Sequence, residues 1–118
     1  MKTASVIVTF NPETNLLARQ LKSISGFTSV FLVDNSSSNI DEISMICKDI
    51  SDTICIIQLA ENMGLGFAQN RGIEEVLKGD YSHLMLFDQD SYLSENSFNS
   101  LMECERSLLK RGVNLGAI

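Results

Sequence analysis

The sequence predicts an α/β domain built on a mostly parallel β-sheet with helices on its faces. Short β-branched runs alternate with longer segments in which apolar residues recur at helical spacing, and this alternation is typical of βαβ units. The length of 118 residues and the hydrophobic content of 44% suit one buried core. With a single proline and no internal repeat, the chain offers no linker. We therefore expect residues 1–118 to form one unit.

The first strand is expected over Ala4–Phe10, where β-branched residues dominate. Pro12 with Thr14 opens a helix that Gly26 ends. Its apolar residues fall on one stripe that can face a sheet. They are Leu16, Leu17, Leu21 and Ile24.

Two more units of the same kind follow. Ser29–Asp34 is predicted as the second strand and Ile40–Ile50 as the helix after it. Thr53–Leu59 is predicted as the third strand. A loop over Glu61–Gly66 then leads into a helix that ends near Lys78.

The last part of the chain is expected to begin another unit. Tyr81–Phe87 is predicted as the fourth strand, and Ser94 caps a long helix that reaches about Arg111. Val113–Ile118 has the composition of a fifth strand, with no loop or helix after it. We expect the chain to end within the fold, after about five strands and four helices.

Composition excludes several classes of function. The net charge is −6, and the nine Lys and Arg are scattered, so no nucleic-acid partner is expected. The odd number of cysteines, without a Cys-x-x-Cys pair, argues against disulfides and a zinc cluster. No secretory signal and no run of roughly 20 apolar residues is present. We expect a cytoplasmic protein, with peripheral association at the inner face of the cell membrane left open. The cysteines are Cys47, Cys55 and Cys104.

Polar residues follow all four predicted strands. Because ligands bind beyond the carboxyl ends of parallel strands, these four sets would meet at one edge of the sheet. Polar loops and caps are common, but four such sets at one edge favour a binding site. The sets are Thr9, Phe10, Asn11 and Glu13; Asp34 and Asn35; Glu61, Asn62, Gly64 and Gly66; and Asp88 and Asp90.

The acidic pair after the fourth strand predicts a cation site. In an extended segment Asp88 and Asp90 project to the same side, while Gln89 points away. Two neighbouring carboxylates repel each other, and a bound Mg²⁺ or Mn²⁺ with substrate phosphates relieves that repulsion. The cation would also let an acidic protein hold an anionic diphosphate. The alternative is that the pair only caps the loop before Ser94.

Two other features suggest contact with a nucleotide. Asp34 can accept a hydrogen bond from a ribose hydroxyl or from N3–H of uracil or thymine, or else it forms a local turn. Gly64 and Gly66 would let the backbone pass close to a ligand, or else start the next helix without a clash, although they lack the context of a dinucleotide fingerprint. His83, the only histidine, precedes the apolar part of its strand, which leaves no candidate for a nucleophilic triad.

Taken in order, these motifs resemble the family 2 glycosyltransferases with the GT-A fold, a Rossmann-like arrangement. Each motif alone is loose, but four in this order are specific, and they cover nearly the whole chain. The segments that carry the resemblance are Val6–Asn11, Val33–Ser37, Asn62–Gly72 and Asp88–Ser91.

The resemblance implies a role for each motif. Thr9, Phe10, Asn11 and Asp34 would surround the nucleotide base, and Asn62–Gly72 would lie along the sugar and phosphates. Asp88 would turn toward the ribose and Asp90 toward the metal. An acceptor hydroxyl would then attack the anomeric carbon with inversion while the metal stabilises the leaving diphosphate. The expected donor-binding residues are Thr9, Phe10, Asn11, Glu13, Asp34, Asn62, Gly64, Gly66, Asn70, Arg71, Asp88 and Gln89, and the expected metal ligands are Asp88 and Asp90.

The same resemblance suggests substrates. The Asp-Gln-Asp-Ser form is similar to that of rhamnosyl-transferring members, which implies a dTDP-rhamnose donor and a role in polysaccharide synthesis. The family resemblance as a whole implies a dTDP- or UDP-sugar donor and a saccharide or lipid-linked saccharide acceptor. Family members are about twice as long as this chain, and their catalytic base lies in the acceptor-binding half that is absent here. We therefore expect donor binding without efficient turnover.

Two other interpretations are kept. A haloacid-dehalogenase-like phosphatase would use Asp88 as its nucleophile, although its Asp-x-Asp normally ends the first strand of the core. A non-catalytic binding module of flavodoxin topology would need acids after the first strand, where Thr9-Phe10-Asn11 offers none.

Overall fold

The computed structural model describes residues 2–87, 89, 99–100 and 102–103. Strands and helices alternate along the described part of the chain, as the sequence pattern predicts. The elements are β1 (Thr3–Thr9), α1 (Thr14–Ser25), β2 (Ser29–Asp34), α2 (Ile40–Ile50), β3 (Cys55–Gln58), α3 (Leu65–Leu77) and β4 (His83–Phe87).

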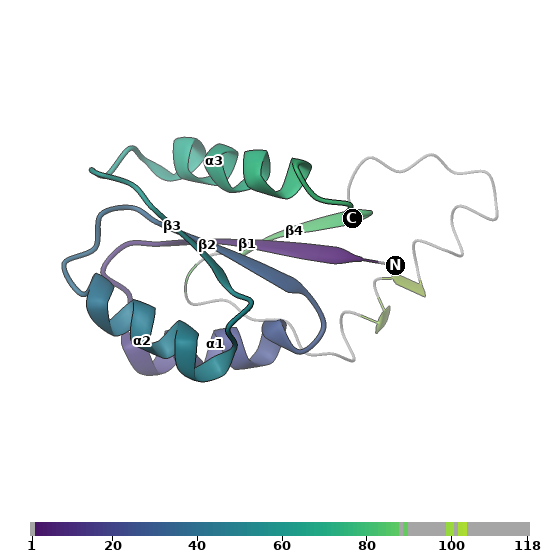
Figure 1. The fold of residues 1–118 in the computed structure, drawn as a ribbon, viewed down its shortest axis with the longest axis horizontal. Helices are drawn as coiled ribbons and strands as arrows, with labels where there is room; N and C mark the ends of the chain where they lie inside the picture. Colours follow the sequence, from purple (N-terminus) through teal and green to yellow (C-terminus); the bar gives the residue numbers. More distant parts are fainter. Residues whose placement is uncertain (1, 88, 90–98, 101, 104–118) are drawn as a thin grey trace.

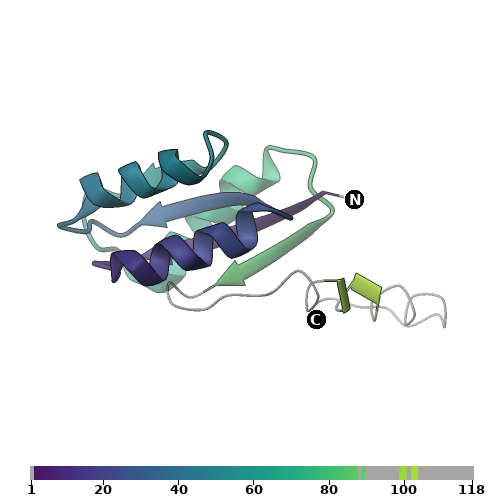
Figure 2. The same cartoon turned by 90° about the horizontal axis from the view of Figure 1, so that it is seen from below.

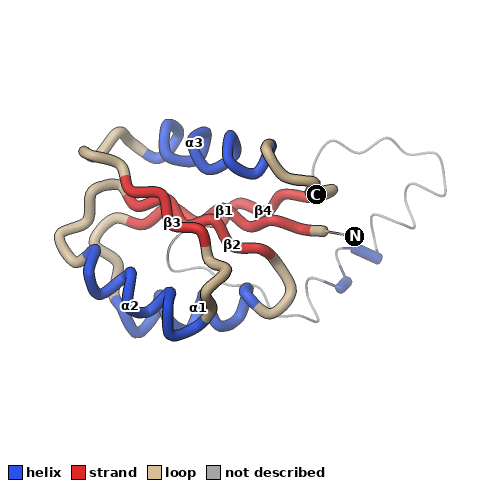
Figure 3. The backbone as a smooth tube through the Cα atoms, in the orientation of Figure 1, coloured by secondary structure: helices blue, strands red, loops and turns tan. Residues whose placement is uncertain are grey.

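The strands form one parallel sheet in the order β3-β2-β1-β4. Helices α1 and α2 lie side by side on one face, and α3 covers the other (Figures 1 to 3). The connections through α1 and α2 run from β1 to β2 to β3 in one direction across the sheet, whereas the connection through α3 runs back from β3 to β4. Because crossovers between parallel strands are right-handed, opposite directions place the connecting helices on opposite faces. The α/β prediction is confirmed. The described order also differs from the 2-1-3-4-5 order of flavodoxin-like domains.

The sheet separates two apolar clusters, and every residue of β1 is buried between them. Side chains alternate between the two faces of a strand, so β1 and β2 each contribute to both clusters. On the face of α1 and α2 the buried residues are Ile7, Leu17, Leu21, Ile24, Val30, Leu32, Ile43 and Cys47. On the face of α3 they are Ala4, Val6, Val8, Val33, Ala68 and Val76.

Helix α3 approaches the sheet closely at Gly72. A Cβ atom on this residue would lie 2.6 Å from Val6 Cγ1 and 3.0 Å from Val33 Cγ2. Both distances are shorter than an ordinary van der Waals contact between carbon atoms. The absence of a side chain at Gly72 therefore lets α3 pack directly on the middle of β1 and β2.

Several predicted boundaries shift by one or two residues. The strand β1 ends at Thr9 rather than Phe10, since Asn11 adopts a left-handed conformation with φ of 45°. Helix α3 begins at Leu65, so Gly66 is helical rather than part of the preceding loop. Strand β3 pairs with β2 only over residues 55–58, and β4 begins at His83. The predicted helix Ser94–Arg111 and strand Val113–Ile118 lie almost entirely outside the described residues.

Within the described residues, none of the helices is long and apolar enough to cross a bilayer.

The two cysteines that the structure describes, Cys47 and Cys55, are free thiols. Burial against the core raises the pKa of Cys47 to about 11. Burial also raises the pKa of Cys55, and the nearby Glu75 carboxylate adds to the rise while Arg71 opposes it.

Cys47 should therefore resist alkylation in the folded protein. With a pKa of about 11, roughly one Cys47 thiol in a thousand is ionised at pH 8, and only the thiolate attacks iodoacetamide. Burial hinders the reagent further. We expect Cys47 to react at least about a hundredfold more slowly in the folded than in the urea-unfolded chain. Peptide mapping by mass spectrometry separates it from the other cysteines, and equal rates in both states would contradict its placement in the core.

Candidate functional site

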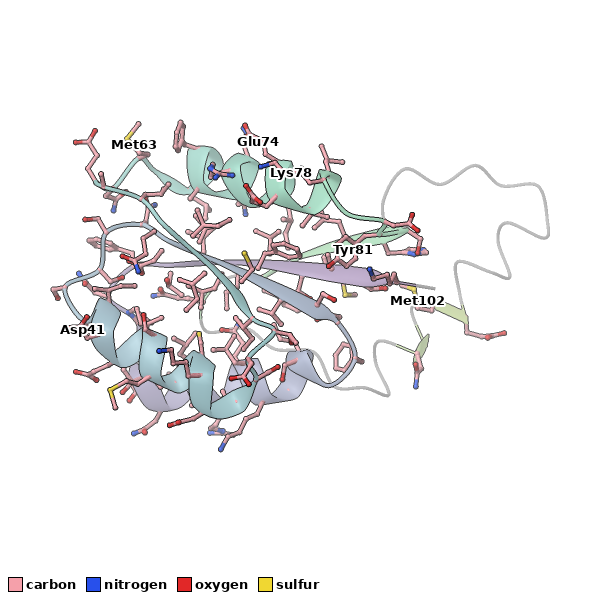
Figure 4. The ribbon with its side chains drawn as sticks, viewed as in Figure 1. Asp41, Met63, Glu74, Lys78, Tyr81 and Met102 are labelled. Carbon is pink, nitrogen blue, oxygen red and sulfur yellow. The ribbon has the colours of Figure 1, made fainter. Side chains whose placement is uncertain are left out.

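The carboxyl ends of the four strands point to one edge of the sheet, where the connecting turns gather. At this edge the order of the strands reverses between β1 and β4. The chain leaves β1 toward α1 on one face, while β4 is entered from α3 on the other. Met63 and Asp41, near the starts of α3 and α2, lie at this end of the molecule, and Lys78 and Tyr81 lie toward the opposite end (Figure 4). Open α/β sheets bind ligands at such a reversal.

Asp34 is the centre of a buried hydrogen-bond network at this edge. Its Oδ1 accepts from Thr9 Oγ1 at 2.7 Å and from Ser37 Oγ at 2.6 Å. Its Oδ2 accepts from the Ser37 amide at 2.8 Å. Asp34 is 1% exposed and Thr9 is fully buried. The carboxylate thus holds the turn after β2, as in the local-turn alternative, and three of its roughly four acceptor positions are filled by the chain itself.

Asn11 connects the turn after β1 with the turn after β2. Its amide N–H donates to Ser37 Oγ at 2.8 Å. Its side-chain Oδ1 accepts from the Ser38 amide at 2.8 Å and from Ser38 Oγ at 3.2 Å. Asparagine tolerates the left-handed backbone that this turn needs. Asn11, whose contact to the base stays a prediction, therefore holds these two turns together.

Asn35 connects the turn after β2 with the start of α3. Its Oδ1 accepts from the Met63 amide at 2.9 Å, and its Nδ2 donates to the Gly64 carbonyl at 3.2 Å. Asn35 is 3% exposed, and Gly64 has a φ of +86°, which favours glycine. Asn35 was not among the predicted donor-binding residues. The only feature of the sequence that could have pointed to Asn35 is its position directly after a strand, and several neighbouring polar residues have the same feature.

A fourth connection joins the turn after β1 with the residues after β4. The Phe10 amide donates to Gln89 Oε1 at 2.8 Å. The Phe10 side chain remains 45% exposed at the same edge. The turns that follow all four strands are therefore linked to one another by hydrogen bonds.

Three of the predicted donor-binding residues lie in or at the start of a helix, and two of them have partners within that helix. The Glu13 carboxylate caps α1 by accepting from the amides of Leu16 at 2.7 Å and Asn15 at 3.3 Å. Asn70 is exposed on α3. Arg71 Nη1 lies 2.8 Å from Glu75 Oε1, and its charge acts on Cys55 at the beginning of β3, away from the carboxyl edge. An ion pair along its own helix thus accounts for Arg71.

The charged cluster on α3 is a surface network. Hydrogen bonds from Lys78 and Arg71 lower the pKa of Glu75, and the bond to Glu75 raises that of Arg71. Lys78 Nζ lies 2.9 Å from the same Glu75 oxygen. Glu75 and Lys78 lie at the C-terminal end of α3, and Arg71 lies in its middle. Gly64 and Gly66 lie at its start and are exposed near the candidate site.

The predicted metal ligands Asp88 and Asp90 lie outside the described residues. Among the residues that are described, no group of three or more His, Cys, Asp or Glu side chains could hold a metal ion. Asp34, a described carboxylate at this edge, is engaged by Thr9 and Ser37. Asp88 and Asp90 therefore stay a prediction as the carboxylate ligands of a cation.

The fold and the linked turns define the class of protein: a doubly wound α/β domain, a class in which ligands bind where the strand order reverses. The chain belongs to glycosyl transferase family 2, whose family model matches residues 5–104. A similar protein is the dTDP-rhamnosyl transferase RfbF of Shigella flexneri, 30% identical over 109 residues, which covers 85% of this chain and 33% of that protein.

Solved structures share the fold. TarS of S. aureus (residues 1–349) superimposes with a TM-score of 0.66 at 18% identity, over 93% of this chain and 33% of TarS. The mannosyltransferase PcManGT of Pyrobaculum calidifontis, solved with GDP-Man and Mn²⁺, gives a TM-score of 0.70 at 16% identity, over 91% of this chain and 32% of its own. These likenesses confirm the GT-A prediction for the fold alone. The chain spans about a third of the length of these proteins, less than the half that the resemblance implied.

Proposed function

We propose that this chain is the nucleotide-sugar-binding part of a glycosyltransferase, with its donor site at the carboxyl edge of the sheet. The main support is the set of hydrogen-bonded polar turns at this edge, of which the bond from Phe10 to Gln89 joins the β1 and β4 sides. The similarity to a dTDP-rhamnosyl transferase supports a dTDP-sugar, with dTDP-rhamnose as the first candidate and a UDP-sugar as the second. The acceptor would be the hydroxyl of a saccharide or lipid-linked saccharide in polysaccharide synthesis, in the cytoplasm or at the inner face of the membrane. The acceptor and its role in polysaccharide synthesis are proposed from the family resemblance.

The base would lie over the Asp34 network. Three bonds from Thr9 and Ser37 fix the carboxylate, and one acceptor position remains on Oδ2. We assign that position to the N3–H of thymine or uracil, reached as the base settles between the turns. The ring of Phe10, which is exposed in the turn after β1, can stack on the face of the base.

The phosphates would extend from there toward Asp88 and Asp90. Oxygen ligands from these carboxylates suit Mg²⁺ or Mn²⁺, and a chain of net charge −6 needs a cation to hold a diphosphate. When bound, the cation would balance the charge of the leaving nucleoside diphosphate. The acceptor oxygen would form a bond to the anomeric carbon on the face opposite the breaking bond to phosphate, which inverts that carbon. No residue of this chain is assigned as the base that takes the acceptor's proton.

A thermal-shift panel tests this proposal. We expect dTDP or UDP to stabilise the chain by about 2.7 kcal/mol at a hundred times the dissociation constant, with Mn²⁺ present. Without Mn²⁺ the shift should shrink, and GDP should give less than either pyrimidine nucleotide.

Two substitutions of aspartate by asparagine provide the control. Asp90→Asn should remove the Mn²⁺-dependent part of the shift, whereas Asp80→Asn, at an exposed site before β4, should keep it. Failure of every nucleotide to shift the melting temperature, with or without Mn²⁺, would refute the proposal.

A further inference from the structure

We propose that Asn35 is a positioning residue that holds residues 63–66, at the start of α3, as one wall of the nucleotide site. The inference rests on the proposed function, because the wall belongs to the site proposed for the base. Asn35 is 3% exposed, and its side chain bonds to two backbone groups 28 and 29 positions further along the chain.

The segment after β3 runs beside the end of β2. The Leu59 amide donates to the Asp34 carbonyl at 2.9 Å, and the Met63 amide donates to Asn35 Oδ1 at 2.9 Å. In the strand order β3-β2-β1-β4, the turn after β1 lies on the other side of β2. A base held over Asp34 would therefore lie between the turn after β1 and the segment 59–64.

Asn35 connects the two sides of this site. Its backbone amide donates to the Thr9 carbonyl at 2.8 Å, which fixes Asn35 to the end of β1. Its side chain reaches α3, where Oδ1 accepts from the Met63 amide and Nδ2 donates to the Gly64 carbonyl at 3.2 Å. An amide N–H can only donate and a carbonyl can only accept, so a single orientation of the side chain satisfies both partners. Asn35 thus sets the position of residues 63 and 64 relative to β1.

The start of α3 has little support from its own helix. Its N-cap residue, Gly64, offers no side chain, and no acid stands in the first turn, whereas Glu13 caps α1 with its carboxylate. The Gly64 amide donates to Asn62 Oδ1 at 2.9 Å, which shapes the turn but does not reach the sheet. A helix start without a side-chain cap takes its position from other contacts. Without the Asn35 side chain, the wall would be free to move away from Asp34.

The link is measured first without a ligand. In the isotope-labelled chain, Asn35→Ala should speed hydrogen exchange of the Met63 amide by about tenfold, because that amide loses its acceptor. Asn35→Asp keeps an acceptor and should keep most of the protection. Unchanged exchange in Asn35→Ala would overturn the link.

Val76→Ala is the matched control for a general loss of stability. Val76 is 4% exposed and packs between the C-terminal part of α3 and the sheet, away from Met63. Both Val76→Ala and Asn35→Ala should lower the melting temperature. Only Asn35→Ala should speed exchange at Met63, because the start of the helix opens locally.

The consequence for binding is measured by titration with dTDP and UDP. One buffer with a fixed concentration of Mg²⁺ is used, so that any contribution from a cation is the same for every variant. Asn35→Ala should weaken the binding of both nucleotides by about tenfold, because the wall must then become ordered when the ligand binds. Val76→Ala should bind them as tightly as the unmodified chain, although its folded state is also less stable.

The outcomes separate this inference from the proposed function. If the unmodified chain binds neither nucleotide, the proposed function fails, and the exchange of the Met63 amide still decides whether Asn35 holds the segment. If Asn35→Ala binds as tightly as the unmodified chain, the positioning role is overturned while the function stands. The role is also overturned if Val76→Ala weakens binding as much as Asn35→Ala, because general stability would then explain both losses.

Discussion

Gly72→Val should lower the free energy of unfolding by about 3 kcal/mol. A Cβ atom alone would come within 2.6 Å of Val6 Cγ1 and 3.0 Å of Val33 Cγ2, and valine adds two more methyl groups. The atoms in the way belong to stiff β-branched side chains on β1 and β2, which cannot rotate aside without leaving their preferred rotamers. Helix α3 would have to move off the sheet. Urea denaturation followed by circular dichroism measures the loss.

The matched control is Gly66→Val on the same helix. No atom lies within 4 Å of a Cβ at Gly66, and its φ is not positive, so valine has room there. We expect a change in stability of at most about 0.5 kcal/mol, since valine is slightly better than glycine in a helix. Equal losses at both positions would mean that helix propensity, and not the contact of α3 with the sheet, governs the result.

Asp34→Ala should cost about 3 kcal/mol of stability and abolish pyrimidine nucleotide binding. The substitution removes the acceptor of the hydroxyls of Thr9 and Ser37 and of the Ser37 amide, all at buried residues. A buried donor that loses its partner keeps its desolvation cost, and this makes the loss larger than the value of the bonds themselves. Urea denaturation and titration with dTDP or UDP measure the two effects.

A double-mutant cycle with Thr9→Val tests the assigned partner. Thr9→Val should destabilise the unmodified chain by about 1 kcal/mol and cost almost nothing when Asp34 is already alanine. Strictly additive losses would show that the bond between Thr9 and Asp34 does not form. Asp80→Ala, at an exposed site, should affect neither stability nor binding.

Much of the fold could be predicted because it depends on local periodicity. The helix α2 has the predicted bounds Ile40–Ile50, and β2 has the predicted bounds Ser29–Asp34. The predicted start of the third strand is wrong, because it depends on where that strand begins to pair with β2. Thr53 belongs to a turn in which its amide donates to Ser51 Oγ, so β3 starts only at Cys55. β-Branched composition alone cannot show where a neighbouring strand begins to pair.

The edge at which the site lies was also predictable, but the partners of its side chains were not. Asp, Asn and Ser after a strand suit either a ligand or a turn, and composition does not distinguish the two. Asn35 and Asn11 bond to residues 26 to 29 positions away, and such contacts depend on how the turns meet. Glu13 and Arg71 are satisfied within α1 and α3, respectively. Local bonds of that kind leave no mark that distinguishes them from ligand contacts in a single sequence.

The hydrogen bonds between the turns also bear on the thermodynamics of association. Loops that must become ordered when a small molecule arrives lose conformational entropy, and that loss weakens affinity. Here Asn11, Asn35 and Gln89 already tie neighbouring loops together in the free chain. The turns after β1, β2 and β3 should therefore need little further ordering when a nucleotide binds. We expect titration calorimetry to show only a small entropic penalty from the backbone.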